Sequence, residues 1–477
     1  MLVAICKLRI IVLTSYYIIK PVREALILAG GTEELSGAVL KSLAATGQVV
    51  LLMIAIPLYS RLASSVPRRK LINLVTIIFA ACLVVFYLLS YTDVPIGFIF
   101  FLWVGIFNLM VPAQFWAFAN DLYTPEAGKR IFVLIAFGAS AGAVLGGVIT
   151  DFLIEIVGVY QLLIIAGVIL LLSLILTNIA DTRDKAEITG TTGNTDAAIE
   201  PEKLLDKGGA FKLVFRKKYL LMIGLMMFLL NWVNTNGEFI LGQTVENSAK
   251  NQIKSQTVNQ QAEEYAIQKW LETENDVSES DEQGQPSAES PVEEIFSKDE
   301  VIQSYKNEYF QQYIEEYIGN FYAGFFTAVN LVGLFLQLFL VSRILKYLGI
   351  RIAILILPII ALTGYIFIAF FPILSIIRWV KIAENSTDYS LQNTVRQVLF
   401  LPTTREEKYK AKQVIDTFFW RAGDVLSTAV VYTGTTWLML KVNQFAVINI
   451  ILVIFWLILA YFIGKENLKM TNQPDKN

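Results

Sequence analysis

The chain alternates between long apolar runs and short polar connections. A helix needs about 20 residues to cross the hydrocarbon core of a bilayer, and runs of that length recur through most of the sequence. Hydrophobic residues make up 55% of the chain and charged residues only 17%, whereas a soluble protein has about a quarter charged. The sequence therefore predicts an all-α polytopic membrane protein with twelve transmembrane helices. The runs lie near 3–29, 38–62, 70–91, 96–122, 131–153, 157–180, 219–243, 319–342, 350–371, 373–400, 413–437 and 444–464.

A spaced pair of arginines indicates that the two sets of six runs are related. Arg61 and Arg69 in the first set match Arg343 and Arg351 in the second, at a common offset of 282 residues. Two related six-helix halves are typical of a transporter whose halves rock about a site between them. The predicted organisation is an N-terminal half 1–180, a linker 181–217, a C-terminal half 219–464 and a tail 465–477.

Basic residues are distributed unevenly among the connections. Those after the second, fourth, eighth and tenth runs carry 13 Lys and Arg, and those after the first, third, fifth, ninth and eleventh carry only Lys441. Because cytoplasmic loops are enriched in Lys and Arg, both termini and the linker 181–217 are expected in the cytoplasm. The expected location is the bacterial inner (plasma) membrane.

An acidic insertion, 245–318, interrupts the second half between its first and second runs. It holds 17 Asp and Glu against 5 Lys and Arg, and the positive-inside pattern places it outside the cell. Its middle, Asp276–Pro291, has a disordered composition, whereas its flanks have a helical one. We expect a solvated appendage rather than a module that binds a protein partner, and such a partner stays undetermined.

The tenth run carries a polar stripe. A charged side chain at mid-bilayer costs about 2.5–3.5 kcal/mol, so the stripe must face other helices or a water-filled cavity. It forms either a structural network, with Lys381 pairing with Glu384 and Asn385, or the wall of a translocation pathway. The pathway is favoured, because ionisable groups inside a membrane commonly mark one. The residues of the stripe are spaced by 3 or 4, which puts them on one helical face. They are Arg378, Lys381, Asn385, Asp388, Gln392 and Arg396, and Glu384 lies beside them.

The first run adds Lys20, Arg23 and Glu24 around Pro21, which bends the helix. Lys20 and Glu24 are spaced to pair, which leaves Arg23 uncompensated within its segment. The surplus of intramembrane cations suits an anionic substrate, since arginine makes forked contacts to phosphate or carboxylate.

Further polar groups lie in other runs. Asn120 and Asp121 end the fourth run beside aromatic residues, so an amide and a ring there could hold a base or sugar. In the eleventh run Arg421 and Asp424 are spaced to pair, and with Asp416 they form either a gate or a structural pair.

Several classes of chemistry are excluded or not expected. The chain has no His, and its two cysteines, Cys6 and Cys82, both lie in apolar runs, so no metal site or cofactor is expected. No phosphate-binding loop of the ATPase type occurs, and Gly138, Gly142 and Gly146 are spaced for close helix packing instead. Neither an enzyme nor a binder of nucleic acid polymers is expected.

Two blocks of sequence stand out. One is Ser15–Gly31 together with Trp116–Asp121 and Ala127–Arg130, and the other is Tyr409–Lys412 together with Asp416 and Arg421–Asp424. These blocks resemble the bacterial and plastid ATP/ADP antiporter family, whose members are related to the major facilitator fold. The likeness covers nearly the whole chain outside 245–318.

The resemblance implies exchange of ATP for ADP, or of a related nucleotide, by a twelve-helix carrier in the lipid bilayer. It implies intramembrane Lys and acidic residues as substrate ligands. Two alternatives stay open: a permease of the same fold for another organic anion or a proton-coupled solute, and a non-transporting scaffold that acts through 245–318. The predicted substrate-binding residues are Lys20, Arg23, Glu24, Asn120, Asp121, Arg378, Lys381, Glu384, Asn385 and Asp388.

Overall fold

The computed structural model is helical throughout the part of the chain that it describes. No strand occurs among its described residues, which fits the apolar runs of the sequence. Side chains are described for a smaller set, which leaves out 112–122, 125–137 and 177–190 among others. The described residues are 2–32, 34–66, 68–92, 94–122, 125–190, 210–282, 297–404, 407 and 411–472.

Six helices form the N-terminal half. Each begins within about one or two turns of an apolar run predicted from the sequence, so hydropathy alone places them. They are α1 (Leu2–Ala29), α2 (Gly37–Ser65), α3 (Arg68–Leu89), α4 (Gly97–Leu122), α5 (Pro125–Val157) and α6 (Gln161–Gly190).

The C-terminal half also contains six long rods, three of which include a π-helical turn (η). One rod joins α10, η1 and α11, another joins α13, η2 and α14, and a third joins α15, η4 and α16. The elements are α7 (Ala210–Arg216), α8 (Lys218–Gln252), α9 (Gln256–Glu282), α10 (Lys298–Phe335), η1 (Leu336–Leu340), α11 (Val341–Tyr347), α12 (Gly349–Phe370), α13 (Leu374–Thr387), η2 (Asp388–Gln392), α14 (Asn393–Leu399), α15 (Lys412–Val414), η4 (Ile415–Phe419), α16 (Trp420–Thr436) and α17 (Val442–Asn472).

Seven helices of the described chain are long and apolar enough to cross a membrane. Two shorter apolar stretches, Gly97–Asn108 in α4 and Gln161–Leu176 in α6, have similar composition over fewer described residues. The seven are Gly37–Ala55, Lys70–Leu89, Gly138–Val157, Lys218–Gln252, Lys298–Tyr347, Gly349–Phe370 and Val442–Thr471.

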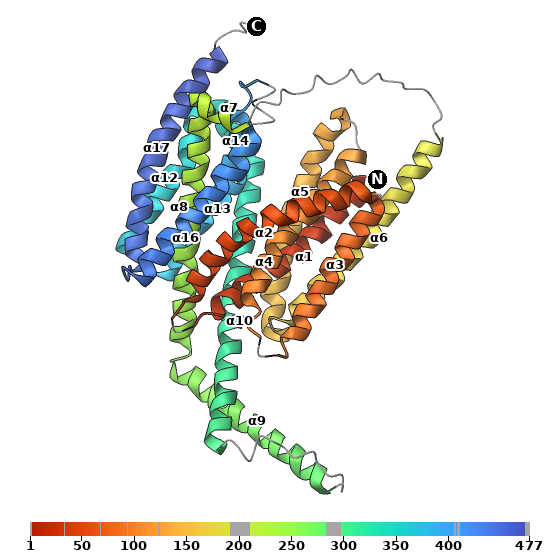
Figure 1. Ribbon diagram of the computed structural model, residues 1–477, viewed down its shortest axis with the longest axis vertical. Helices are drawn as coiled ribbons and strands as arrows, with labels where there is room; N and C mark the ends of the chain where they lie inside the picture. The colour runs from red at the N-terminus through yellow and green to blue at the C-terminus, as the bar shows by residue number, and fades with distance from the viewer. Residues whose placement is uncertain are drawn as a thin grey trace.

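The two halves stand side by side and diverge toward the end that carries the C-terminus (Figure 1). Within the N-terminal half, α1 packs on α4, α5 and α6. The predicted glycine packing is confirmed there, because a Cβ at Gly142 or Gly146 of α5 would overlap the α1 backbone carbonyls of Ile10 and Thr14. Between the halves, α10 packs on α1 and α5, and α2 packs on α8 and α16.

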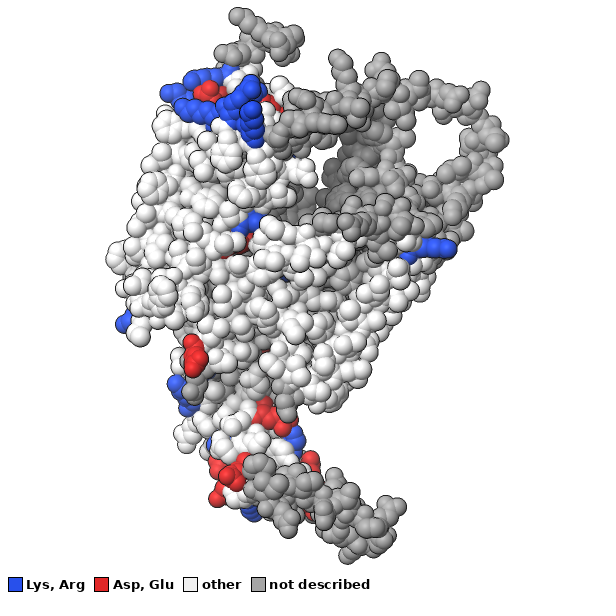
Figure 2. Space-filling model, in the orientation of Figure 1, with Lys and Arg blue, Asp and Glu red and all other residues white. Residues whose placement is uncertain are grey.

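The two ends of the molecule differ in charge (Figure 2). We call the end near the C-terminus the basic end, since it exposes Lys212, Arg216, Lys217 and Lys218. The opposite end, from which α9 projects, is the arm end, where both acidic and basic side chains are exposed. This separation agrees in direction with the loop charges of the sequence.

The arm consists of α9 and residues 298–318 of α10, which pack along one another. The Lys269 ammonium lies 2.6 Å from the Glu308 carboxylate, and the Lys298 ammonium lies 3.6 Å from the centre of the Trp270 ring. Residues 276–282 continue α9, so the prediction of disorder is wrong for them; 283–296 lie outside the described residues. The turns of α9 that precede 276 are held on α10, and the helix continues from them.

The orientation can be tested by labelling single cysteines in intact cells. We expect a membrane-impermeant maleimide to label Glu274→Cys on the arm and not Lys469→Cys at the basic end, with Cys6 and Cys82 replaced by serine. Permeabilised cells serve as the control, since both positions should then react. Labelling of Lys469→Cys alone in intact cells would invert the topology.

Candidate functional site

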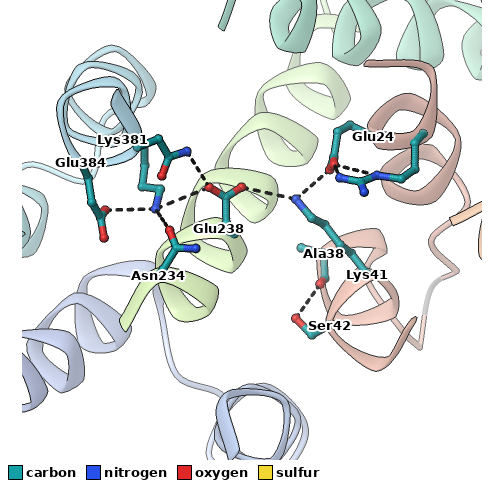
Figure 3. A network of polar contacts seen from close by, with 10 residues as sticks. Glu24, Ala38, Lys41, Ser42, Asn234, Glu238, Lys381 and Glu384 are labelled. Carbon is teal, nitrogen blue, oxygen red and sulfur yellow. Dashed lines mark hydrogen bonds and ion pairs between the residues drawn. The ribbon is translucent and has the colours of Figure 1, made fainter. Parts of the chain in front are cut away.

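Glu238 of α8 lies between two ammonium groups, one from each half (Figure 3). Lys41 Nζ of α2 is 3.7 Å from Glu238 Oε2, and Lys381 Nζ of α13 is 3.5 Å from Oε1. Asn385 also donates a hydrogen bond of 3.0 Å to Oε1. One carboxylate therefore ties the N-terminal half to the C-terminal half.

On the N-terminal side, Glu24 pairs with Arg23 and with Lys41, whose Nζ is 2.7 Å from Glu24 Oε2. The expected pairing of Glu24 with Lys20 is wrong, and so is the expectation that Arg23 is uncompensated. The Lys20 ammonium instead lies 3.8 Å from the centre of the Phe326 ring, a cation–π contact. Lys41 belongs to a neighbouring helix, so spacing within α1 could not reveal it as the partner.

On the C-terminal side, Lys381 is fully buried and donates to Glu384 Oε2 and Asn234 Oδ1, each at 3.0 Å. The predicted Lys381–Glu384 pair is confirmed, and the Tyr365 hydroxyl donates to the same carboxylate at 3.0 Å. The chain of ion pairs contains three cations and three carboxylates, so it is neutral as a whole. Its members, here called the network, are Arg23, Glu24, Lys41, Glu238, Lys381 and Glu384.

Hydrogen bonds between the halves continue from the network to the arm end. Glu246, fully buried, accepts from the Ala38 amide at 3.0 Å, and Asn320 donates to Glu155 at 2.5 Å. These bonds close the halves against each other on this side. The others are Ser36 to Gln243 at 2.8 Å, Thr428 to the Ser42 carbonyl at 2.8 Å, Tyr160 to Glu315 at 3.4 Å, and Gln311 to the Ala29 carbonyl at 3.4 Å.

A cavity of about 720 Å³ lies between the halves on the basic-end side of the network. A guanidinium from each half lines it: Arg9 from α1, and Arg396 from α14. The volume falls within the range of small-molecule sites, about 300–1,000 Å³. The lining residues are Arg9, Leu13, Tyr17, Asn108, Ala139, Ser140, Ala143, Met227, Leu230, Asn330, Asp388, Tyr389, Gln392, Asn393, Arg396 and Trp420.

Aromatic rings surround the cationic groups of this cavity. The Arg396 guanidinium lies 5.7 Å from the centre of the Trp420 ring. The Lys20 ammonium lies 5.3 Å from the Tyr17 ring and 6.0 Å from the Tyr389 ring, so it stands at the boundary between network and cavity. Among the described residues, no carboxylate forms an ion pair with Lys20.

The structure separates the predicted substrate-binding residues into several places. Asp388 lines the cavity and Lys20 borders it. Arg378 lines a different groove, between α10 and α13, where its guanidinium is 5.3 Å from the Phe321 ring. Asn120 and Asp121 lie outside the described side chains. Arg23, Glu24, Lys381 and Glu384 belong to the network, to which Asn385 is hydrogen-bonded.

The eleventh-run residues lie apart from the network. Arg421 and Asp424 do pair, at 3.2 Å, and Asp424 also accepts from Asn231 and Thr235 of α8. Asp416 lies in η4, and its Oδ1 has no hydrogen-bond partner in the described part of the chain.

Sequence reasoning named no role for Arg9, Tyr17 or Trp420, which line the cavity. Arg9 and Tyr17 belong to α1 and Trp420 to α16, and only the fold places these elements, with α14, around one cavity. Gln392 and Arg396 were on the predicted stripe without being named as ligands. The 3- and 4-residue spacing was the signal that could have found them.

Part of the chain matches a known family in sequence, and the whole fold matches solved structures. A family model described as the Major Facilitator Superfamily matches residues 9–246. None of the curated proteins matches the chain in sequence. The fold is that of several solved transporters, at 10–14% sequence identity.

Three solved structures illustrate the likeness. A bacterial homolog of the human lysosomal transporter Spinster, inward-facing and unoccupied, is 14% identical with a TM-score of 0.54, and the match covers 99% of each chain. The nucleoside transporter NupG is 10% identical with a TM-score of 0.57, covering 98% of this chain and 100% of that one. A POT family transporter in complex with 5-aminolevulinic acid is also 10% identical with a TM-score of 0.57, covering 98% and 96%.

The described part of the chain thus forms twelve long helical rods in two halves, with a polar cavity between them. This is the major facilitator fold, which the chain shares with solved membrane transporters, and residues 9–246 also match that family in sequence.

Removal of Lys381 tests the network. Lys381→Gln leaves Glu384 buried without its cation, and breaking a buried pair costs about 3–5 kcal/mol, so we expect a lower melting temperature in detergent. Adding Glu384→Gln should restore much of the loss. A single variant that melts like the wild type but loses substrate binding would show that Lys381 contacts substrate instead.

Neutralising Glu238 tests the tie between the halves. In Glu238→Gln, Lys41 and Lys381 lose their shared anion and repel, so the halves should separate more often at the arm end. The measurement is the yield of cross-linking between Glu155→Cys and Asn320→Cys in a background without Cys6 and Cys82. Glu466→Gln, at an exposed pair near the basic end, is the matched control. Equal yields in both variants would contradict the role of Glu238.

Proposed function

We propose that this protein is a membrane transporter rather than an enzyme, and that it exchanges anionic nucleotides, ATP and ADP or close relatives, by alternating access at the cavity between its halves. One observation carries the proposal: the cavity presents a guanidinium from each half, together with aromatic rings. A substrate that touches both guanidinium groups would draw the halves together. This coupling between occupancy and closure is what an alternating-access carrier requires.

Charge favours a polyanionic substrate. Arg9 and Arg396 line the cavity with Asp388 as the one carboxylate among its lining residues, and Lys20 adds a cation at its boundary. The charged groups of the network, by contrast, pair with one another, and the network is neutral as a whole. The positive excess is therefore concentrated where a substrate would lie, and arginine suits phosphate because of its forked donors.

Aromatic groups favour a substrate with a planar part. Tyr17, Tyr389 and Trp420 line the same cavity as the guanidinium groups, and rings of this kind stack on nucleobases with about 1–3 kcal/mol per base. A nucleoside transporter is among the solved structures of the same fold, so the fold accommodates a nucleobase. The resemblance to nucleotide antiporters supports the same substrate class.

The proposed conformation faces the cytoplasm. The network and the hydrogen bonds beyond it close the arm end, whereas the cavity lies toward the basic end. The positive-inside rule assigns the basic end, with both termini, to the cytoplasmic side of the plasma membrane. The exchange cycle then requires the Lys41–Glu238 contact to open so that the cavity can face outward.

Exchange in vesicles tests the function. Vesicles that contain purified transporter and internal ADP should take up labelled ATP, and removal of the internal ADP should slow uptake. Arg396→Gln should weaken ATP uptake at least tenfold at low substrate, because it removes a charge-assisted contact worth about 1.5–3 kcal/mol. Arg343→Gln, an exposed arginine of the same half, is the control and should leave uptake unchanged.

The cavity charge also fits other organic anions, which gives the second candidate function. A permease of this kind would take up another phosphorylated or carboxylated solute, and uptake would not depend on internal nucleotide. Competition by unlabelled ATP, ADP, phosphate and sugar phosphates separates the two. Strong inhibition by sugar phosphates without inhibition by nucleotides would favour the permease.

A further inference from the structure

We infer that Gln392 recognises the uncharged part of the substrate, by pairing its amide with the donor–acceptor edge of a nucleobase. The inference rests on the proposed function, because it assigns a specificity role within the same cavity. It divides recognition between two neighbouring residues of one helix. Arg396 binds the anionic part of the substrate, and Gln392 forms hydrogen bonds with the nucleobase.

Gln392 is a buried amide without a partner. It lines the cavity and is only 2% exposed. Within the described part of the chain, neither its Oε1 nor its Nε2 makes a hydrogen bond. A buried polar group left unpaired costs about 1–3 kcal/mol, and native structures contain few of them. The cost is offset when a ligand supplies both a donor and an acceptor.

The neighbouring polar side chains are already occupied. Thr394 donates to the Ser390 carbonyl at 3.0 Å, and Asn393 accepts from Arg396 at 2.9 Å. Gln392 is thus the buried amide of this turn whose oxygen and nitrogen both lack a partner among the described residues. It ends the π-helical turn η2, and π-helical turns inside α-helices occur frequently at functional sites.

The amide selects a particular chemistry. A carboxamide offers one acceptor beside one donor group, which matches the edge of a base in a two-bond contact, as glutamine does with adenine. A phosphate chain or a sugar phosphate presents no such planar edge. The Tyr389 and Trp420 rings line the same cavity and provide faces for a planar ligand. The site therefore distinguishes a nucleotide from a base-free polyphosphate.

Gln392→Met tests this role, since methionine keeps the unbranched shape and removes both hydrogen-bonding groups. Binding of ATP and of inorganic tripolyphosphate to purified transporter is measured by calorimetry. We expect ATP affinity to fall roughly 5- to 100-fold, as for loss of one two-bond base contact, with tripolyphosphate affinity unchanged. The melting temperature without ligand should stay equal or rise, because an unpaired polar group has left the interior.

Gln397→Met is the matched control. Gln397 is an exposed glutamine of the same helix that accepts a hydrogen bond from Lys412, outside the cavity lining. It should leave ATP affinity unchanged. An unchanged ATP affinity in Gln392→Met, equal losses for ATP and tripolyphosphate, or a lower melting temperature without ligand would each overturn the inference. The wild-type measurement tests the proposed function separately. If the wild type binds no ATP, the proposed function fails, and the role of Gln392 fails with it.

Discussion

A carboxylate at membrane depth is costly unless a cation lies beside it, and the half-buried Glu238 lies between two of them. Its contacts to Lys41 at 3.7 Å and to Lys381 at 3.5 Å fix how α2, α8 and α13 face each other. Because each of those lysines also pairs with a second carboxylate, no charge of the network is left alone in the apolar interior. The packing of the two halves at the arm end depends on this balance.

The network and the cavity divide the intramembrane charges into two groups with different tasks. The charged groups of the network pair with one another, and these ion pairs stabilise the conformation in which the arm end is closed. The guanidinium of Arg396 instead contacts an aromatic ring and a neutral amide side chain, and its Nε has no hydrogen-bond partner among the described residues. A substrate anion can therefore interact with it without first breaking an ion pair.

Hydropathy and spacing predicted the helical class, the two sets of six rods and the inward-facing stripe of the tenth run. They also predicted the Lys381–Glu384 pair, because both partners lie on one helix at a fixed separation. They failed at Glu24, whose partner Lys41 comes from another helix, and at Arg9, which the fold alone brings near Arg396. Spacing within a helix constrains its own face, whereas contacts between helices depend on crossing angles that one sequence does not encode locally.

The long helix α10 joins the arm to the membrane without a break. Its 38 residues extend about 57 Å, nearly twice the thickness of the hydrocarbon core, about 30 Å. A stiff rod of this length acts as a lever: when the halves rock through a small angle, displacement grows with distance from the pivot. The tip of α9 would then travel farther than any residue of the cavity, so a fluorophore on the arm would report the state of the transport cycle from the aqueous phase.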